Sequence, residues 1–263
     1  MSELFQQAVA NTLPHLKSIE GGIKPAPKAS LAALKKLQAA AKAVSPVPLM
    51  TREVKNATPW TWSTLEKAIL SCQKCQNLVA SRTPVVFGVG NRDAELMFIG
   101  EAPGADEDKL GEPFVGRAGQ LLTKIIEAMG FTRDDIFIAN VLKCRPDMSA
   151  GESGNRKPRM DEMTTCLPWL REQIQLVKPR VMVALGATAA EGLLGETRPM
   201  RELRGQWLDF HSTPVMVTYH PAYLLRNQTI TEKRKVWEDM LLVLEKLGLP
   251  ISEKQRKFFT QAA

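Results

Sequence analysis

The chain has 263 residues, of which 44% are hydrophobic and 24% are charged, a composition typical of a soluble protein with one substantial core. No apolar run approaches the length of a membrane-spanning helix, and the first residues lack the apolar segment of a secretory signal peptide. These features argue against a membrane or secreted protein. We expect a cytoplasmic protein of bacterial origin.

The net charge of +7 favours a nucleic-acid partner only weakly, because the charge is unevenly distributed. Residues 1–58 hold eight Lys or Arg against three Glu, a net charge of +5. This segment is also rich in Ala, Lys and Pro, which is typical of flexible linkers. We therefore predict a flexible basic arm over residues 1–58 and one folded domain over residues 59–263.

Beyond the arm, short apolar stretches alternate with amphipathic ones. The apolar stretches predict strands at 95–100, 135–142, 180–186 and 214–220. The amphipathic stretches predict helices at 116–130, 159–177, 187–195 and 232–248. This alternation is typical of a parallel sheet that is covered on both faces. The fold class that it predicts is α/β: a three-layer α/β/α sandwich around a mostly parallel four-stranded sheet.

Three of these strands lead into loops of unusual composition. The loops read GEAPGADED (100–108), ANVLKCRP (139–146) and HPAYLLRN (220–227). In open α/β sheets, ligands bind beyond the carboxyl ends of the strands. We therefore predict that the three loops converge on one crevice.

The first loop and the residues after it combine glycines with acidic side chains. A glycine such as Gly100 lets backbone N–H groups approach a ligand closely. Five acidic residues from Glu101 to Glu112 argue against a phosphate cradle, and such a density would suit a divalent metal. Phe114 fits either a core position or a platform on which a flat ligand stacks.

The third loop contains a residue that cannot continue a strand. Pro221 follows His220 and predicts the first position of a helix. On this interpretation Leu224 and Leu225 turn inward.

The four cysteines form another candidate site. Cys72 and Cys75 make a C-x-x-C pair, and Cys144 and Cys166 are isolated. Four thiols in a cytoplasmic protein favour a metal site over disulfides, and no strand precedes the pair as a thioredoxin-like motif requires. Zinc and a [4Fe–4S] cluster both accept four thiolates, and spacing alone does not separate them. Cys166 also fits a small core position.

Several motifs together resemble the family-four (iron–sulfur) uracil-DNA glycosylases. They are GEAPGADEDKLGEPFVGRAGQLL, NVLKCRP followed by NRKP, and HPAYLLRN, in that order and with four cysteines beside them. The resemblance covers residues 72–246. It implies an α/β/α sandwich, a structural [4Fe–4S] cluster on Cys72, Cys75, Cys144 and Cys166, and hydrolysis of the N-glycosidic bond of uracil in DNA. The product would be an abasic site, for base excision repair.

The resemblance also implies a role for residues of each loop. Uracil would be flipped out of single- or double-stranded DNA into a pocket, without any membrane and by a monomer. His220 would stabilise the charge that develops on uracil O2. A water would attack the sugar, either positioned by Glu101 or Asn155 or unassisted. The expected uracil-binding residues are Phe114 by stacking, Asn140 by pairing with N3–H and O4, Glu107 beside C5, and Gly100 and Ala102 in the turn.

The DNA-binding residues implied by the resemblance lie in two loops. Leu224 or Leu225 would fill the gap that the flipped base leaves, and Arg226 would meet a phosphate. Arg156 is a further expected DNA contact.

Two features of this chain depart from related proteins. Ala102 stands where better-known uracil-DNA glycosylases have an aspartate that activates water. The residues DMSAGESG separate Asn155 and Arg156 from the KCRP motif.

Two other functions compete with this interpretation. One is a relative that binds uracil-containing DNA without turnover or captures it covalently, but the loop CRPDMSAGESGNRKPRM has no histidine for such capture. The other is a zinc-containing nucleic-acid-binding protein.

Overall fold

The computed structural model describes residues 60–148 and 154–260. The predicted basic arm therefore lies outside the described residues. Within them, no helix is long and apolar enough to cross a membrane.

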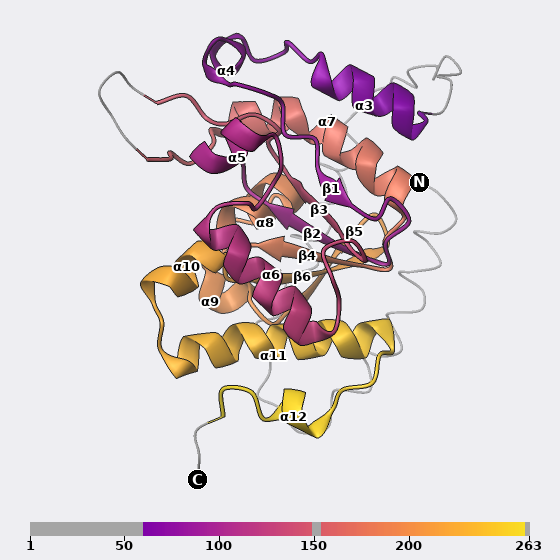
Figure 1. Cartoon of the computed structure of the whole chain (residues 1–263), viewed down its shortest axis with the longest axis vertical. Coiled ribbons are helices and arrows are strands. Elements are labelled where there is room, and N and C mark those ends of the chain that lie inside the picture. Colours follow the sequence, from indigo (N-terminus) through magenta and orange to yellow (C-terminus); the bar gives the residue numbers. More distant parts are fainter. Residues whose placement is uncertain (1–59, 149–153, 261–263) are drawn as a thin grey trace, which may run out of the picture. The chain divides into compact units, whose positions relative to one another are not determined.

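The centre of the fold is a six-stranded sheet with the strand order β1-β3-β2-β4-β6-β5 (Figure 1). The strands are β1 (Val89–Gly90), β2 (Leu96–Gly100), β3 (Phe137–Asn140), β4 (Val181–Leu185), β5 (Trp207–Phe210) and β6 (Thr213–Thr218). The inner strands β3, β2, β4 and β6 pair in parallel, and β1 and β5 join the edges antiparallel.

The four inner strands are the four that the sequence predicts, so the mostly parallel sheet is confirmed, whereas the predicted strand number was too low. The two edge strands escaped prediction for different reasons. β1 has only two residues, too few for any pattern. β5 is mostly exposed or half-buried and lacks the continuous apolar run of a central strand.

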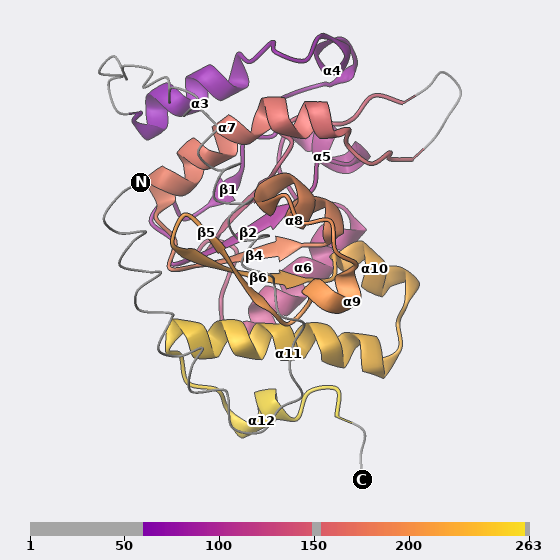
Figure 2. The same cartoon turned by 180° about the vertical axis from the view of Figure 1, so that it is seen from behind.

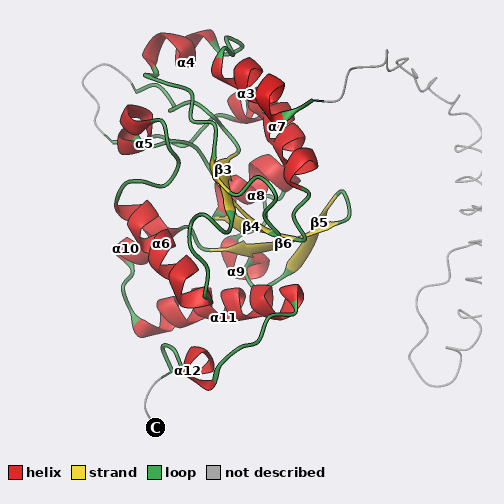
Figure 3. Cartoon of the chain, turned by 45° about the vertical axis from the view of Figure 1, so that its right-hand side comes forward, coloured by secondary structure: helices red, strands yellow, loops and turns green. Residues whose placement is uncertain are grey.

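Long helices cover both faces of this sheet, with α7 along one side and α11 along the other (Figures 1 and 2). The larger helices are α3 (Trp62–Leu70), α6 (Arg117–Met129), α7 (Met160–Val177), α8 (Ala187–Leu194) and α11 (Ile230–Leu247). The predicted helices at 116–130, 159–177, 187–195 and 232–248 are confirmed to within two residues at each end. Figure 3 shows the helices on either side of the strands.

The side chains of β2 show how the three layers form. Met97 and Ile99 enter the core cluster shared with α3, α7 and α8, while Leu96 and Phe98 enter the cluster shared with α6 and α11. Successive residues of a strand point to opposite faces, so a wholly apolar strand feeds two cores. The three-layer α/β/α architecture is confirmed.

Shorter helices connect these layers and carry functional loops. They are α4 (Gln76–Ser81), α5 (Ala105–Leu110), α9 (Met200–Leu203), α10 (Pro221–Arg226) and α12 (Glu253–Arg256). Of these the sequence predicts only the start of α10 at Pro221, because four to six residues carry little periodicity. The predicted inward turn holds for Leu224, which is buried, and partly for Leu225, which is half-buried.

Candidate active site

The three loops beyond the carboxyl ends of β2, β3 and β6 line one cavity of about 480 Å³. This confirms that they converge. The residues singled out above that line it are Glu101, Ala102, Glu107, Phe114, Asn140, Asn155, Arg156, His220 and Arg226. Such a volume is ordinary for a small-molecule pocket.

Asn140 ends strand β3 and presents an unused acceptor. The residue is 2% exposed, and within the described part of the chain its Oδ1 has no hydrogen-bond partner. Buried polar atoms are nearly always paired, so an unpaired one in a cavity wall indicates a position that a ligand completes.

Gly100 lies beside Asn140 on the neighbouring strand, because the two are partners in the parallel β2–β3 register. A Cβ at Gly100 would overlap Asn140 Oδ1 and would lie 2.5 Å from Phe114 Cζ. Only a glycine therefore lets the amide and the aromatic ring meet at this point.

The backbone of Phe114 is held in an unfavourable conformation. Its φ is 55°, a region that bulky residues rarely adopt. Arg133 donates to the carbonyl oxygens of Pro113 at 2.9 Å and of Phe114 at 3.3 Å, and a Cβ at Gly119 would overlap the Phe114 carbonyl. Strain of this kind persists only where the surroundings impose it, often at ligand sites. The ring is both a core residue and part of the cavity wall.

His220 faces Phe114, with ring centres 5.6 Å apart. It caps α10, and its Nδ1 accepts a hydrogen bond from the backbone N–H of Ala222 at 3.1 Å. Burial, together with the charge of Arg226, lowers the pKa of His220 to about 4. The imidazole is therefore neutral at pH 7, and because Nδ1 is an acceptor, its proton lies on Nε2.

Two carboxylates lie at the same cavity. Glu107 accepts from the backbone N–H groups of Val115 at 3.1 Å, Gly116 at 3.0 Å and Gly104 at 3.1 Å, so it ties the loop to the start of α6. Burial raises the pKa of Glu101, which is half-buried, and a hydrogen bond from Thr188 opposes that rise.

Asn155 reaches the cavity in spite of the residues inserted before it. Its Nδ2 lies 3.1 Å from the position that a Cβ at Gly104 would occupy. The structure thus brings Asn155 together with the β2 loop, as the NRKP motif predicts.

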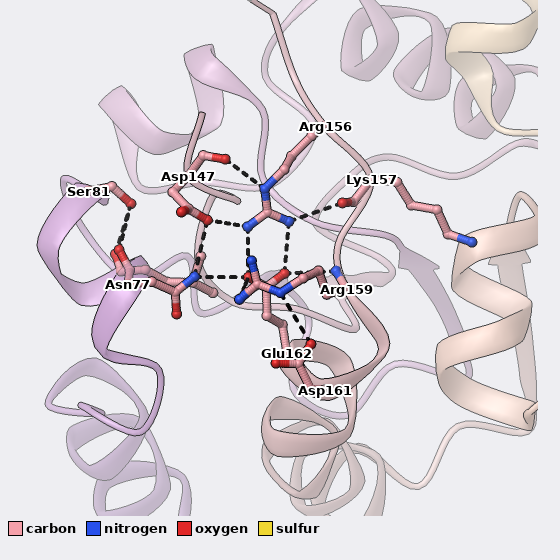
Figure 4. A network of polar contacts seen from close by, with 9 residues as sticks. Asn77, Ser81, Asp147, Arg156, Lys157, Arg159, Asp161 and Glu162 are labelled. Carbon is pink, nitrogen blue, oxygen red and sulfur yellow. Dashed lines mark hydrogen bonds and ion pairs between the residues drawn. The ribbon is translucent and has the colours of Figure 1, made fainter. Parts of the chain in front are cut away.

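Arg156, expected to contact DNA, is engaged elsewhere (Figure 4). Its guanidinium pairs with the carboxylates of Asp147 and Glu162, and it donates to the backbone oxygens of Asp147 at 2.6 Å and Lys157 at 3.1 Å. These partners leave the guanidinium little capacity for a phosphate. The sequence predicts a DNA contact for Arg156, and in this structure its guanidinium instead bonds to these protein partners.

The two leucines of the third loop differ in exposure. Leu224 is 4% exposed and packs into the protein, so the expectation that it enters DNA does not fit this conformation. Leu225 is half-buried, and Arg226 beside it is exposed. Both leucines also line a separate apolar groove of about 300 Å³ beside α6 and α11.

Cys72, Cys75, Cys144 and Cys166 line one small cavity, and all four are free thiols. Within the described residues, no three His, Cys, Asp or Glu side chains are grouped so that they could hold one metal ion.

Hydrogen-bond donors approach three of the four sulfur atoms. Arg82 Nη1 lies 3.0 Å from Cys144 Sγ, the Lys143 backbone nitrogen lies 3.3 Å from Cys166 Sγ, and Trp169 Nε1 lies 3.4 Å from Cys72 Sγ. Burial raises the pKa of Cys166 to about 12 and also raises those of Cys75 and Cys144. Thiolates at these positions need cationic compensation, which a metal centre supplies.

Several residues that build these sites carried no sequence signal. Arg82 supports a cysteine, Arg133 supports Phe114, and Asp147 and Glu162 hold Arg156. Each is an ordinary charged residue in a polar stretch, and only the folded arrangement reveals its partner.

Comparison with known proteins places the chain in a family. The sequence model of the Uracil DNA glycosylase superfamily matches residues 87–241. A type-4 uracil-DNA glycosylase of Thermotoga maritima is 42% identical over 178 residues, which are 67% of this chain and 89% of that protein. One of Sulfurisphaera tokodaii is 40% identical over 195 residues, which are 70% of this chain and 84% of that protein. A type-5 uracil-DNA glycosylase of Pyrobaculum aerophilum is 28% identical over 201 residues, 64% of this chain and 85% of that protein. The chain therefore belongs to the uracil-DNA glycosylase superfamily, and its identity to type-4 proteins places it in the type-4 family.

Proposed function

We propose that this protein is a uracil-DNA glycosylase that hydrolyses the bond between uracil and deoxyribose in DNA and leaves an abasic site for base excision repair. The observation that carries the proposal is the buried Oδ1 of Asn140, which has no hydrogen-bond partner among the described residues and lies in a cavity shared with Phe114 and His220. Membership of the type-4 uracil-DNA glycosylase family supports the same activity.

The selectivity for uracil rests on the amide of Asn140. Its Oδ1 would accept from uracil N3–H, and its Nδ2 would donate to O4. Cytosine presents the opposite pattern of donor and acceptor, so a fixed amide rejects it. Stacking on Phe114 would contribute about 1–3 kcal/mol. Glu107, tied to three backbone N–H groups, would form a rigid wall beside C5 and exclude the methyl group of thymine.

Bond breaking requires stabilisation of the leaving base. As the C1′–N1 bond breaks, its electron pair moves to the uracil ring and charge gathers on O2, while the sugar gains oxocarbenium character. His220 is neutral and carries its proton on Nε2, so it would donate to O2 at the moment the charge develops.

The attacking water would be served by polar groups at the cavity edge. Glu101 and Asn155 both line the cavity, and either would orient a water toward C1′. The raised pKa of Glu101 would suit a carboxylate that accepts the water proton. Ala102 contributes no side-chain group for this step.

Uracil must leave the base stack before it enters the cavity. We propose that Leu225 occupies the space left by the base and that Arg226 pairs with a nearby phosphate, because these two residues are accessible while Leu224 is buried. A residue that fills the gap stabilises the extruded nucleotide.

The four cysteines would hold a [4Fe–4S] cluster. This proposal is supported by four free thiols around one cavity and by the donors near three sulfur atoms. When bound, such a cluster links three segments of the chain covalently through iron. The residues proposed to contact the base are not among these four cysteines or the donors beside them.

An oligonucleotide with one uracil at a defined position tests the function. After incubation and alkaline cleavage of abasic sites, a gel should show a single cut at the uracil and none when thymine or cytosine stands there. Tight binding without cleavage would favour the non-catalytic relative, and a colourless, zinc-containing preparation would favour the zinc protein.

A further inference from the structure

Arg156 lies at the centre of a polar network that joins separate parts of the chain (Figure 4). It pairs with Asp147 and donates to Glu162 at 2.7 and 2.9 Å. Asn77 donates to both of the same carboxylates at 3.1 Å. Three segments far apart in the sequence therefore share one set of hydrogen bonds.

Each of these segments also carries cysteines. Asn77 follows Cys75 by two positions in the chain, Asp147 follows Cys144 by three, and Glu162 precedes Cys166 by four, one turn earlier on α7. The hydrogen bonds of the network thus link the same three segments that carry the four cysteines.

Arg156 touches the other site as well. It lines the proposed uracil cavity, and it directly follows Asn155, which reaches that cavity beside Gly104. Glu162, its main partner, has a side chain that is only 2% exposed, so the pair is shielded from water and from salt on that side. A buried carboxylate needs such partners, because leaving it unpaired is costly.

We propose that Arg156 is a positioning residue that fixes Asn155 in the uracil cavity by anchoring its loop to the cysteine-bearing segments, and that it makes no contact with DNA. This inference rests on the proposed function. On this inference Arg156 couples two sites. The position of Asn155 depends on assembly of the cysteine site, and retention of the [4Fe–4S] cluster by the cysteines depends on the hydrogen bonds of Arg156.

The chemistry of the side chain fits this role. A guanidinium has five N–H donors in a planar fork, which allows it to bridge two carboxylates and two carbonyl oxygens at once. Lysine has one point charge and cannot reproduce that pattern. Arg226 is the contrasting residue, since it is exposed at the cavity edge and free to meet a phosphate.

The test compares Arg156→Gln and Arg156→Lys with Arg159→Gln in the full-length holoprotein. Arg159 is a matched control because it contacts the same Glu162 at 3.0 Å but does not line the cavity. Three quantities are measured: single-turnover excision of uracil, the salt dependence of DNA binding, and the rate at which a chelator removes iron. Arg226→Gln serves as the reference for loss of a phosphate contact.

For Arg156→Gln we expect single-turnover excision to fall about 10²-fold, since small displacements of positioned groups cost rate of this order. The slope of the logarithm of the DNA-binding constant against the logarithm of salt concentration should equal that of the wild type. Arg226→Gln should reduce the magnitude of that slope by about 1. Iron release should be several-fold faster than in Arg159→Gln. Arg156→Lys should fall between the wild type and Arg156→Gln in rate and iron retention.

Three results would overturn the inference. One is a reduced salt slope in Arg156→Gln, which would make the residue a phosphate contact. Another is an excision rate equal to that of Arg159→Gln, and the third is unchanged iron release. If Arg156→Gln does not fold, Arg156→Lys decides, and excision and iron release at wild-type rates would refute the inference. A wild type that excises no uracil would instead refute the proposed function.

Discussion

Replacing Gly100 by alanine probes the closest approach in the proposed uracil pocket. The added Cβ would lie 2.5 Å from Phe114 Cζ and would overlap Asn140 Oδ1. Neither Phe114 nor Asn140 can move away from the added Cβ easily. The backbone of Phe114 is held by Arg133 and by the lack of space at Gly119, and Asn140 is fixed at the end of β3 in the parallel ladder.

The size of the displacement follows from these contacts. An ordinary carbon–carbon contact is at least about 3.5 Å, so the ring must retreat by about 1 Å from its present 2.5 Å separation. Shifts of about 1 Å in groups that position a substrate cost on the order of 10² in rate. The overpacking itself should lower the free energy of unfolding by about 1–3 kcal/mol.

The assay is single-turnover excision of uracil at saturating enzyme, with urea unfolding measured on the same preparations. Gly130→Ala is the control, because its φ is 96° and its added Cβ would meet no atom of the described residues within 4 Å. It should lose about 1–2 kcal/mol of stability through backbone strain and keep its excision rate. Gly100→Ala with wild-type excision would refute the placement of Phe114 and Asn140 at the reacting base.

The remaining predictions concern three individual residues. Asn140→Asp should abolish most uracil excision, because a carboxylate cannot donate to O4, and any residual activity should shift toward cytosine; equal activity on uracil in matched oligonucleotides would contradict this. Burial lowers the pKa of His220 to about 4 from 6.5, so between these values the folded protein binds fewer protons than the unfolded chain and stability falls as the pH falls. From pH 7 to pH 5 this residue should cost the wild type about 2 kcal/mol. Urea titrations of His220→Gln should lack that loss, and an identical pH dependence would argue against a buried neutral imidazole. Cys144→Ala should reduce bound iron from about four atoms per chain and lower the yield of soluble protein, and metal analysis that finds zinc in the wild type would reject the cluster.

The sequence predicts the inner part of the fold well because that part is periodic. Buried strands such as β2 and β4 are wholly apolar, and helices such as α6 repeat their apolar residues at helical spacing. The edge strands and the short helices carry no such pattern. Their existence depends on the neighbour they pair with, which only the assembled fold provides.

In the candidate site, too, some residues are predictable from the sequence and others are not. Asn140 ends β3 and His220 follows the end of β6 by two residues, and topology alone predicts ligand contacts at such positions. For Arg156, a basic residue near a DNA-binding motif predicts a phosphate contact, and the sequence gives no sign of the two carboxylates that it pairs with in the fold. The sequence predicts that Leu224 or Leu225 enters DNA, and it does not separate the two. In the structure, Leu224 is buried and Leu225 is half-buried, a difference set by one residue step along α10.

The most direct test of the proposed function is quantification of free uracil and abasic DNA released from a single-uracil oligonucleotide by the wild type and by His220→Ala. We expect equal amounts of the two products and more than one turnover per wild-type chain. In His220→Ala we expect a single-turnover rate lower by about 10²–10³, with nearly unchanged DNA binding, because one donor to the developing anion is lost. A wild type that stops after one covalent event, or a His220→Ala variant with full activity, would contradict it.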